Sequence, residues 1–220
     1  MKPGRRALLA APLAALWVRA FDALAAGSVE KGIHRIRGDV RVNGAPAKEG
    51  QDVRAGEVLT TGGASEAVFV AGKDAFLVRE HSRIEVQGAS GSLLLTGLRI
   101  VSGAVLSVFS PGEAKTVRTP TATIGIRGTG AYVEALADRS YVCICYGEAE
   151  IASSMDASAR ETIRTSHHEQ PRYVMGMGSP QMLMGAPVIN HTDIELGFLE
   201  GLVGRRPPFL DVPPERRLTY

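Results

Sequence analysis

The sequence predicts an all-β fold, in which many short strands form a sandwich, a roll or a short β-solenoid, with one short helix near the C-terminus. Two observations predict it. The 220 residues include 25 glycines and 12 prolines but few aromatic residues, which favours short elements joined by tight turns. β-branched runs also return about every ten residues, with glycines and no helical period between them. We expect one domain, because the length suffices for a single sizeable core.

The N-terminus has the pattern of a cleaved signal peptide over residues 1–26. Lys2, Arg5 and Arg6 precede an apolar run over residues 7–18, and small residues of the A-x-A type end at Ala25 and Ala26. The apolar run is about a dozen residues long, whereas a spanning helix needs roughly 20. The paired arginines leave both the general secretory and the twin-arginine route open. We therefore expect a periplasmic or secreted protein whose mature chain has no transmembrane segment.

The charge of the mature chain gives no reason to expect a nucleic-acid partner. The whole sequence has a formal net charge of +2, with 25 basic and 23 acidic side chains. Removing residues 1–26 takes away four basic residues and one acidic residue, which leaves 21 and 22, a net charge of −1. A nearly neutral body with interspersed signs has no electrostatic attraction for a phosphate backbone.

The expected β domain covers residues 33–165. Asn43-Gly44 follows the first short run and is a strong two-residue hairpin signal. Later runs end in the same way at glycines, as at Gly62-Gly63, Gly72 and Gly88. In order along the chain, the expected strands are residues 40–42, 58–61, 67–70, 75–78, 84–86, 93–95, 98–101, 104–109, 116–118, 123–126, 131–135, 141–146 and 148–152.

The chain changes character after residue 165. Residues 166–191 are rich in methionine, glycine and proline, and we expect an irregular segment across the β body. Thr192 and Glu195 form a capping-box pattern that opens a helix over residues 192–204. Ile194, Phe198, Leu199 and Leu202 would share one side of this helix, whose two glycines make it dependent on docking. Residues 205–220 are expected to be extended or disordered.

Several motifs follow one another between Gly38 and Ala152. Gly38-Asp39-Val40 leads to Asn43-Gly44-Ala45-Pro46-Ala47, and Gly56-Glu57-Val58-Leu59-Thr60-Thr61 follows. The most specific motif is Thr119-Pro120-Thr121-Ala122-Thr123-Ile124-Gly125-Ile126-Arg127-Gly128-Thr129. This order resembles the FecR domain, which is found outside the cytoplasmic membrane in bacteria. The resemblance implies a β-rich fold and a role in sensing or protein contact, with no catalytic activity. The best-known members are transmembrane regulators of sigma factors, whereas we expect this chain to lack the sigma-regulator and transmembrane regions.

The last of these motifs supplies the candidate ligand or structural signature: Thr119, Pro120, Gly125, Arg127, Gly128 and Thr129. We interpret it as a turn between strands. Pro120 fixes its own φ and extends Thr119, while Gly125 and Gly128 permit positive φ or a close backbone approach. Arg127 would either contact a carboxylate or phosphate or satisfy loop carbonyls, and the structural role is favoured.

The spacing of Cys143 and Cys145 is the one unusual chemical feature. Residues two apart on a strand face the same side, with Cα atoms roughly 6.5 Å apart, so a disulfide would be strained. Two parallel thiols could instead bind a soft metal, Zn²⁺ or copper, together with His167 and His168. Against this, adjacent histidines on a strand would face opposite sides, and free cysteines often pack as small hydrophobes. The metal site, the disulfide and plain packing all stay open.

No enzyme motif is present in the sequence. We therefore expect a binding or scaffold module with an envelope protein as its partner and without a certain cofactor. The alternative is a metal-binding or thiol-redox protein that uses the Cys-x-Cys pair and the two histidines.

Overall fold

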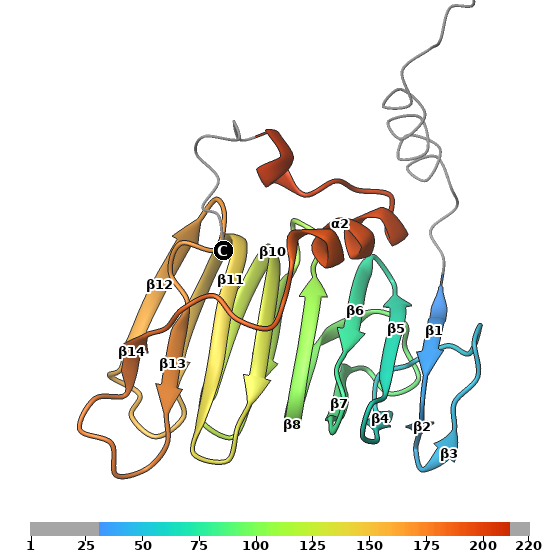
Figure 1. Ribbon diagram of the computed structural model, residues 1–220, viewed down its shortest axis with the longest axis horizontal. Coiled ribbons are helices and arrows are strands. Elements are labelled where there is room, and N and C mark those ends of the chain that lie inside the picture. The colour runs from blue at the N-terminus through green and yellow to red at the C-terminus, as the bar shows by residue number, and fades with distance from the viewer. Residues whose placement is uncertain (1–30, 212–220) are drawn as a thin grey trace, which may run out of the picture.

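The computed structural model describes residues 31–211, so the expected signal peptide at residues 1–26 and the end of the tail lie outside the described residues. Fourteen strands in this part of the chain belong to one sheet, and a short helix follows them (Figure 1). The all-β prediction with a C-terminal helix is confirmed. The elements are β1 (Gly32–Arg37), β2 (Val40–Val42), β3 (Ala45–Pro46), β4 (Val58–Thr61), β5 (Glu66–Ala71), β6 (Asp74–Val78), β7 (Arg83–Gly88), β8 (Leu95–Val108), β9 (Ala114–Arg118), β10 (Ala122–Ala135), β11 (Arg139–Ser153), β12 (Arg160–Thr165), β13 (Arg172–Met175), β14 (Leu183–Gly185), α2 (Asp193–Leu202) and the 3₁₀ turn η1 (Pro208–Asp211).

The sheet folds over itself into two layers, which is the roll among the architectures left open by the sequence. Layer A contains β1, β5, β6, the second halves of β8 and β10, the first half of β11, β13 and β14. Layer B contains β2, β3, β4, β7, β9, β12 and the remaining halves of the three long strands. The strands β8, β10 and β11 therefore pass from one layer into the other and join the layers covalently.

Each long strand changes layer at a glycine with positive φ. Gly103 in β8, Gly128 in β10 and Gly147 in β11 have φ of 80°, 61° and 94°. A Cβ atom on Gly128 would lie 2.7 Å from the Cα atom of Pro111. Only glycine fits such a conformation at such a close approach without strain. The expected special backbone at Gly128 is present, but the same expectation for Gly125 is wrong, because Gly125 lies in a strand without positive φ and an added Cβ would meet no atom closer than 4.0 Å.

The main core lies between the two layers. It contains Phe69 and Phe76 from layer A together with Leu59, Ile84 and Ile124 from layer B, all fully buried. A second apolar cluster covers the outer face of layer A and includes Tyr132, Tyr141 and both cysteines. β11 is consequently buried on both faces from Ser140 to Tyr146, unlike an ordinary antiparallel strand with one solvated face.

The outer face of layer A is covered by residues 186–211, which we call the strap. Figure 1 shows it running across β13, β11 and β10 before α2 lies against the ends of β8 and β6. The capping box of Thr192 and Glu195 is present as predicted, and Leu196, Leu199 and Leu202 are buried. Leu199 and Leu202 are buried as expected, but Ile194 is 85% exposed, because the docked side of α2 includes Leu196 in its place.

Two other expectations for the C-terminal region need correction. Residues 166–191 are not wholly irregular, because β13 and β14 extend layer A beyond β11. The tail is not extended throughout, because η1 buries Phe209 in the second apolar cluster. No helix in the described part of the chain is long and apolar enough to cross a membrane.

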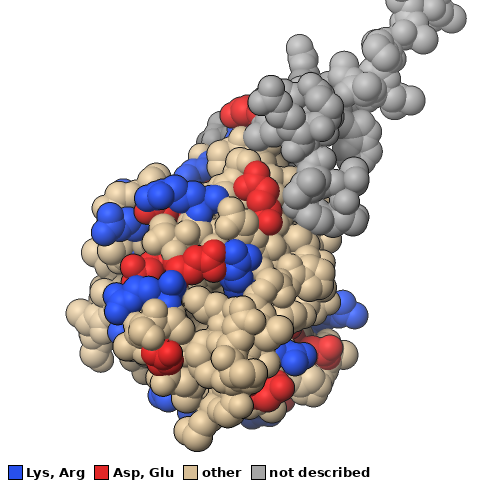
Figure 2. Space-filling model, turned by 90° about the vertical axis from the view of Figure 1, so that its left-hand side faces the viewer, with Lys and Arg blue, Asp and Glu red and all other residues tan. Residues whose placement is uncertain are grey.

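Arg172 on β13 and Glu161 on β12 form a two-pronged ion pair between two strands that pair with different halves of β11, with N–O distances of 2.8 and 2.6 Å. Figure 2 shows basic and acidic side chains interspersed on the surface at this side of the molecule. The hydrogen bond from Arg172 lowers the pKa of Glu161 below its ordinary 4.5. The pair therefore stabilises the fold fully above pH 4.5, and its contribution is lost as the pH falls through the lowered pKa.

We expect Arg172→Met to lower the free energy of unfolding at pH 7 by about 0.5–1 kcal/mol, because the pair is partly exposed. The difference from the wild type should shrink as the pH falls below 4.5. Urea denaturation at several pH values measures it. Arg160→Met is the control, since the exposed Arg160 guanidinium donates to the Ala157 carbonyl and has no carboxylate partner among the described residues. A difference that persists unchanged at low pH would contradict the prediction.

Candidate functional site

The signature residues are placed mainly by structural contacts. Thr119 Oγ1 accepts hydrogen bonds from the Ala122 amide at 2.8 Å and from the Ser140 hydroxyl at 2.7 Å. Thr121 bonds Ser140 and the Val174 carbonyl. These buried hydroxyls tie the turn before β10 to β11 and β13. The turn spans residues 119–121 only, and the rest of the signature lies within β10, which corrects the interpretation of the whole motif as a turn.

The other signature residues lie apart from this hydroxyl network. Pro120 is exposed at the turn, and Thr129 is fully buried at the bend of β10. Arg127 is exposed and lines a shallow surface depression with Glu148 and Arg164. Because Glu148 pairs with Arg164 at 2.7 Å and Glu169 also lines the depression, the depression has mixed charge around Arg127 rather than a cluster of cations for an anionic ligand.

The two cysteines lie on β11 under the strap, on the same side of the strand as predicted. Both are free thiols with 0% exposure, so the described structure contains no disulfide between them. The hydrogen bond from Cys145, followed by those with His168 and His191, holds the pKa of Cys143 well below its usual 9.0 despite the opposing effect of burial. Burial raises the pKa of Cys145. The pair therefore favours one thiolate, on Cys143.

Two histidines from different segments meet Cys143. His168 Nδ1 lies 3.4 Å from Cys143 Sγ, and His191 Nε2 lies 3.0 Å from the same His168 nitrogen. His191 stacks on Tyr132 with 4.7 Å between ring centroids. All of these side chains are buried. The structure thus brings together Cys143, Cys145, His168 and His191.

His167, the fourth residue proposed from the sequence, belongs to a neighbouring group. Its Nε2 lies 2.9 Å from Asp193 Oδ2, while His168 Nε2 lies 3.1 Å from Asp193 Oδ1. The two histidines follow β12 in a turn, so the expectation that they face opposite sides of a strand is wrong. One carboxylate at the start of α2 holds both rings, and His167 is directed to that carboxylate rather than to the cysteines.

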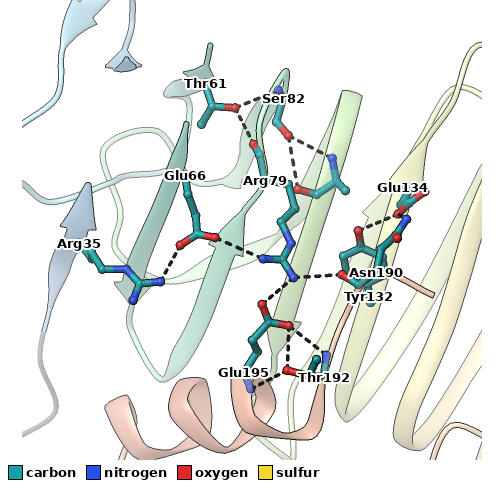
Figure 3. A network of polar contacts seen from close by, with 11 residues as sticks. Arg35, Thr61, Glu66, Arg79, Ser82, Tyr132, Glu134, Asn190, Thr192 and Glu195 are labelled. Atoms are coloured by element: carbon teal, nitrogen blue, oxygen red, sulfur yellow. Dashed lines mark hydrogen bonds and ion pairs between the residues drawn. The ribbon is translucent and has the colours of Figure 1, made fainter. Parts of the chain in front are cut away.

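A second polar network surrounds Arg79, at the end of β6 (Figure 3). Arg79 pairs with Glu66 of β5 at 3.2 Å and with Glu195 of α2 at 2.7 Å, and it donates to the Asn190 carbonyl. Asn190 in turn donates to Glu134, which also accepts from Tyr132. Burial lowers the pKa of Arg79, but its bonds to Glu195 outweigh this effect and raise it. These contacts hold the strap, including α2, against layer A.

A surface hollow of about 760 Å³ opens beside this network. Arg37 and Glu80 are exposed on its wall, and Leu136 is 37% exposed there. The inner residues Arg79, Glu66 and Glu134 are already paired with protein partners. The hollow therefore presents a polar surface of mixed charge with a small apolar contact.

Sequence reasoning missed the contributions of His191, Asp193 and Arg79 to these sites. His191 lies 23 residues beyond His168, in a strap whose path the sequence does not specify. Its place next to the capping box was the available signal, because the start of α2 fixes His191 and Asp193 relative to each other. Arg79 and Glu195 are 116 residues apart, and no local pattern links them.

Comparisons with known proteins gave matches among solved structures. No protein-family model matches the chain, and no curated protein matches it. The FecR resemblance thus stays a prediction from the motifs. Two crystal structures, each described as a "putative anti-sigma factor" from Parabacteroides distasonis, are 10% identical to this chain with a TM-score of 0.49. The matches cover 66% of this chain and 65% and 64% of the two solved chains, so this chain spans just under two thirds of their length.

Proposed function

We propose that this chain is a FecR-like binding module that acts outside the cytoplasm in envelope sensing or protein contact, and that it is not an enzyme. The observation that carries the proposal is the hollow beside the Arg79 network. Its exposed side chains, Arg37 and Glu80, have opposite charges, and Leu136 adds an apolar contact. A mixed polar surface with an apolar element suits a protein surface rather than a phosphate backbone.

The burial of the reactive side chains supports a role in binding rather than catalysis. Cys143 is 0% and His168 is 2% exposed, and the strap covers both. A substrate would have to displace the strap to reach them. The strap is held by the Arg79–Glu195 ion pair and by the hydrogen bond from Tyr141 to the Pro187 carbonyl. The apolar run at residues 7–18 supports export.

A photoreactive amino acid at Leu136 tests the proposal in bacteria that produce the full chain. We expect a discrete protein adduct in the envelope or periplasmic fraction, on a chain that begins at residue 26 or 27. Leu94, which is 66% exposed and lies outside the residues lining the hollow, is the matched control position and should give no such adduct. Arg37→Glu should reduce the adduct at Leu136, whereas the exposed Arg41→Glu on β2 should not.

Two outcomes would contradict the proposal. One is an adduct of equal yield from Leu136 and Leu94, or one insensitive to Arg37→Glu, because the contact would then not involve the hollow. The other is a chain that stays in the cytoplasm with residues 1–26 intact, because it would not meet an envelope partner.

A further inference from the structure

Four metal-ligating side chains converge between β11 and the strap. One ligand atom from each of Cys143, Cys145, His168 and His191 lies within 4.8 Å of all the others. Their residues are 0%, 0%, 2% and 8% exposed. We propose that these four side chains form a tetrahedral Zn²⁺ site that links the strap to layer A. The proposal does not depend on the binding function proposed for the hollow.

The distances fit the edges of a zinc tetrahedron. Zn–S and Zn–N bonds of about 2.3 and 2.0 Å imply S–N and N–N edges of roughly 3.5 and 3.3 Å. The observed distances are 3.4 Å between Cys143 Sγ and His168 Nδ1 and 3.0 Å between His168 Nδ1 and His191 Nε2. These two edges would need shifts of only a few tenths of an ångström, and all the other ligand atoms lie within 4.8 Å of one another. Cysteines two apart on one strand supply the remaining ligand, Cys145, from the same side of β11.

The rings of His168 and His191 each form a hydrogen bond through one nitrogen. These bonds orient the rings so that the lone pairs of the two other nitrogens point toward the same place. His168 Nε2 lies 3.1 Å from Asp193 Oδ1, and a hydrogen there leaves Nδ1 as an acceptor. His191 Nδ1 lies 2.6 Å from the Ile189 carbonyl, which accepts its hydrogen and leaves Nε2 as an acceptor. These two acceptor nitrogens face each other at 3.0 Å. Two facing acceptors repel each other unless a proton or a metal cation lies between them, and carboxylate or carbonyl partners behind the rings are typical of metal-bound histidines.

The backbone is strained at or next to both histidine ligands. His168 has a φ of 54°, and Asn190, which precedes His191, has a φ of 61°. Positive φ is uncommon for residues other than glycine and is often retained at functional sites. The His168 amide also donates to the Cys145 carbonyl at 3.0 Å. The strained turn is thereby fixed to the strand that carries both cysteines.

The charge of the ligand set favours Zn²⁺. Two thiolates and two neutral imidazoles around one Zn²⁺ have a total charge of zero, which minimises the cost of burying the ion. Four protein ligands leave no coordination position for a substrate, so the site is structural rather than catalytic. Asp193 lies outside the four ligands and orients His168 through its second nitrogen.

The full chain with a histidine-free affinity tag tests the site. We expect about one zinc per chain by mass spectrometry, and Co²⁺ substitution should give the visible bands of tetrahedral cobalt with a thiolate charge-transfer band. Cys143→Ser with Cys145→Ser should abolish stoichiometric binding. Asp193→Asn should weaken zinc binding about 10–100-fold in competition with a chelator, because it disturbs the orientation of His168 but removes no ligand.

His81→Ala is the matched control, since the His81 side chain is 74% exposed and lies outside the cluster. It should bind zinc like the wild type. Asp193→Asn keeps the test informative if the cysteine variants fail to fold. The proposal is overturned if the zinc-loaded wild type retains less than about a tenth of an equivalent, if the double cysteine variant retains its zinc, or if copper displaces zinc as the stoichiometric metal.

Discussion

Replacing Lys115 with methionine is expected to lower the free energy of unfolding by about 3–5 kcal/mol, because it leaves a buried carboxylate without its partner. Lys115 Nζ lies 3.3 Å from Asp74 Oδ2, and their side chains are 3% and 2% exposed. The same ammonium donates to the Leu95 carbonyl at 2.5 Å. These contacts join β6 of layer A to β8 and β9 of layer B. Guanidinium denaturation measures the loss in the free energy of unfolding, and the m-value should stay unchanged.

Two further variants separate the buried pair from a general effect of removing a lysine. Lys73→Met changes an exposed lysine next to Asp74 and should alter the stability by less than about 0.5 kcal/mol. Combining Lys115→Met with Asp74→Asn should recover part of the loss, because no buried charge is then left unpaired. A loss below about 1 kcal/mol in Lys115→Met would show that the pair contributes little.

Gly128→Ala is expected to lower the free energy of unfolding by about 2–3 kcal/mol. Two causes add together: the φ of 61° is unfavourable for alanine, and the new Cβ would lie 2.7 Å from Pro111 Cα and 3.2 Å from Pro111 N. Backbone atoms of a neighbouring segment cannot move away as a flexible side chain can. Thermal and denaturant unfolding of the purified protein measure the effect.

Gly125→Ala, three residues earlier in the same strand, is the matched control. The nearest atom to its added Cβ is the Glu150 carbonyl oxygen at 4.0 Å, an ordinary contact. We expect a change within about 0.5 kcal/mol, because alanine suits extended backbone at least as well as glycine. Equal losses in the two variants would refute the role of Gly128 as the bend between layers.

The sequence predicted the class of the fold better than the lengths of its strands. Residues 98–101 and 104–109 were expected as separate strands with Gly103 between them, but both belong to β8. A glycine in a β-rich sequence can end a strand or bend it, and the local pattern is the same in both cases. The difference depends on whether another segment pairs across the glycine, which is a long-range property of the sheet.

The cysteine ligands of the candidate metal site could be predicted from the sequence, because their placement depends on strand geometry. The two cysteines share a side because residues two apart on a strand always do, and that prediction is confirmed by their common place in the second apolar cluster. The placement of the histidine ligands depends on the turn after β12 and on the path of the strap. For this reason His168 joined the cluster, His167 was directed to Asp193, and His191 was not anticipated as a partner of the cysteines.

The strap also has a consequence for the order of events during synthesis and folding. The part of the outer face of layer A that carries Tyr132 and Tyr141 is formed by strands up to β11, but its cover comes from residues 186–211. The contact from Arg79 to Glu195 spans 116 residues, and contacts of such high sequence separation form slowly. A growing chain that has not yet produced the strap presents a bare apolar sheet to its surroundings, and such surfaces attract aggregation or chaperones. Protection of this nascent intermediate is therefore a requirement of the architecture itself.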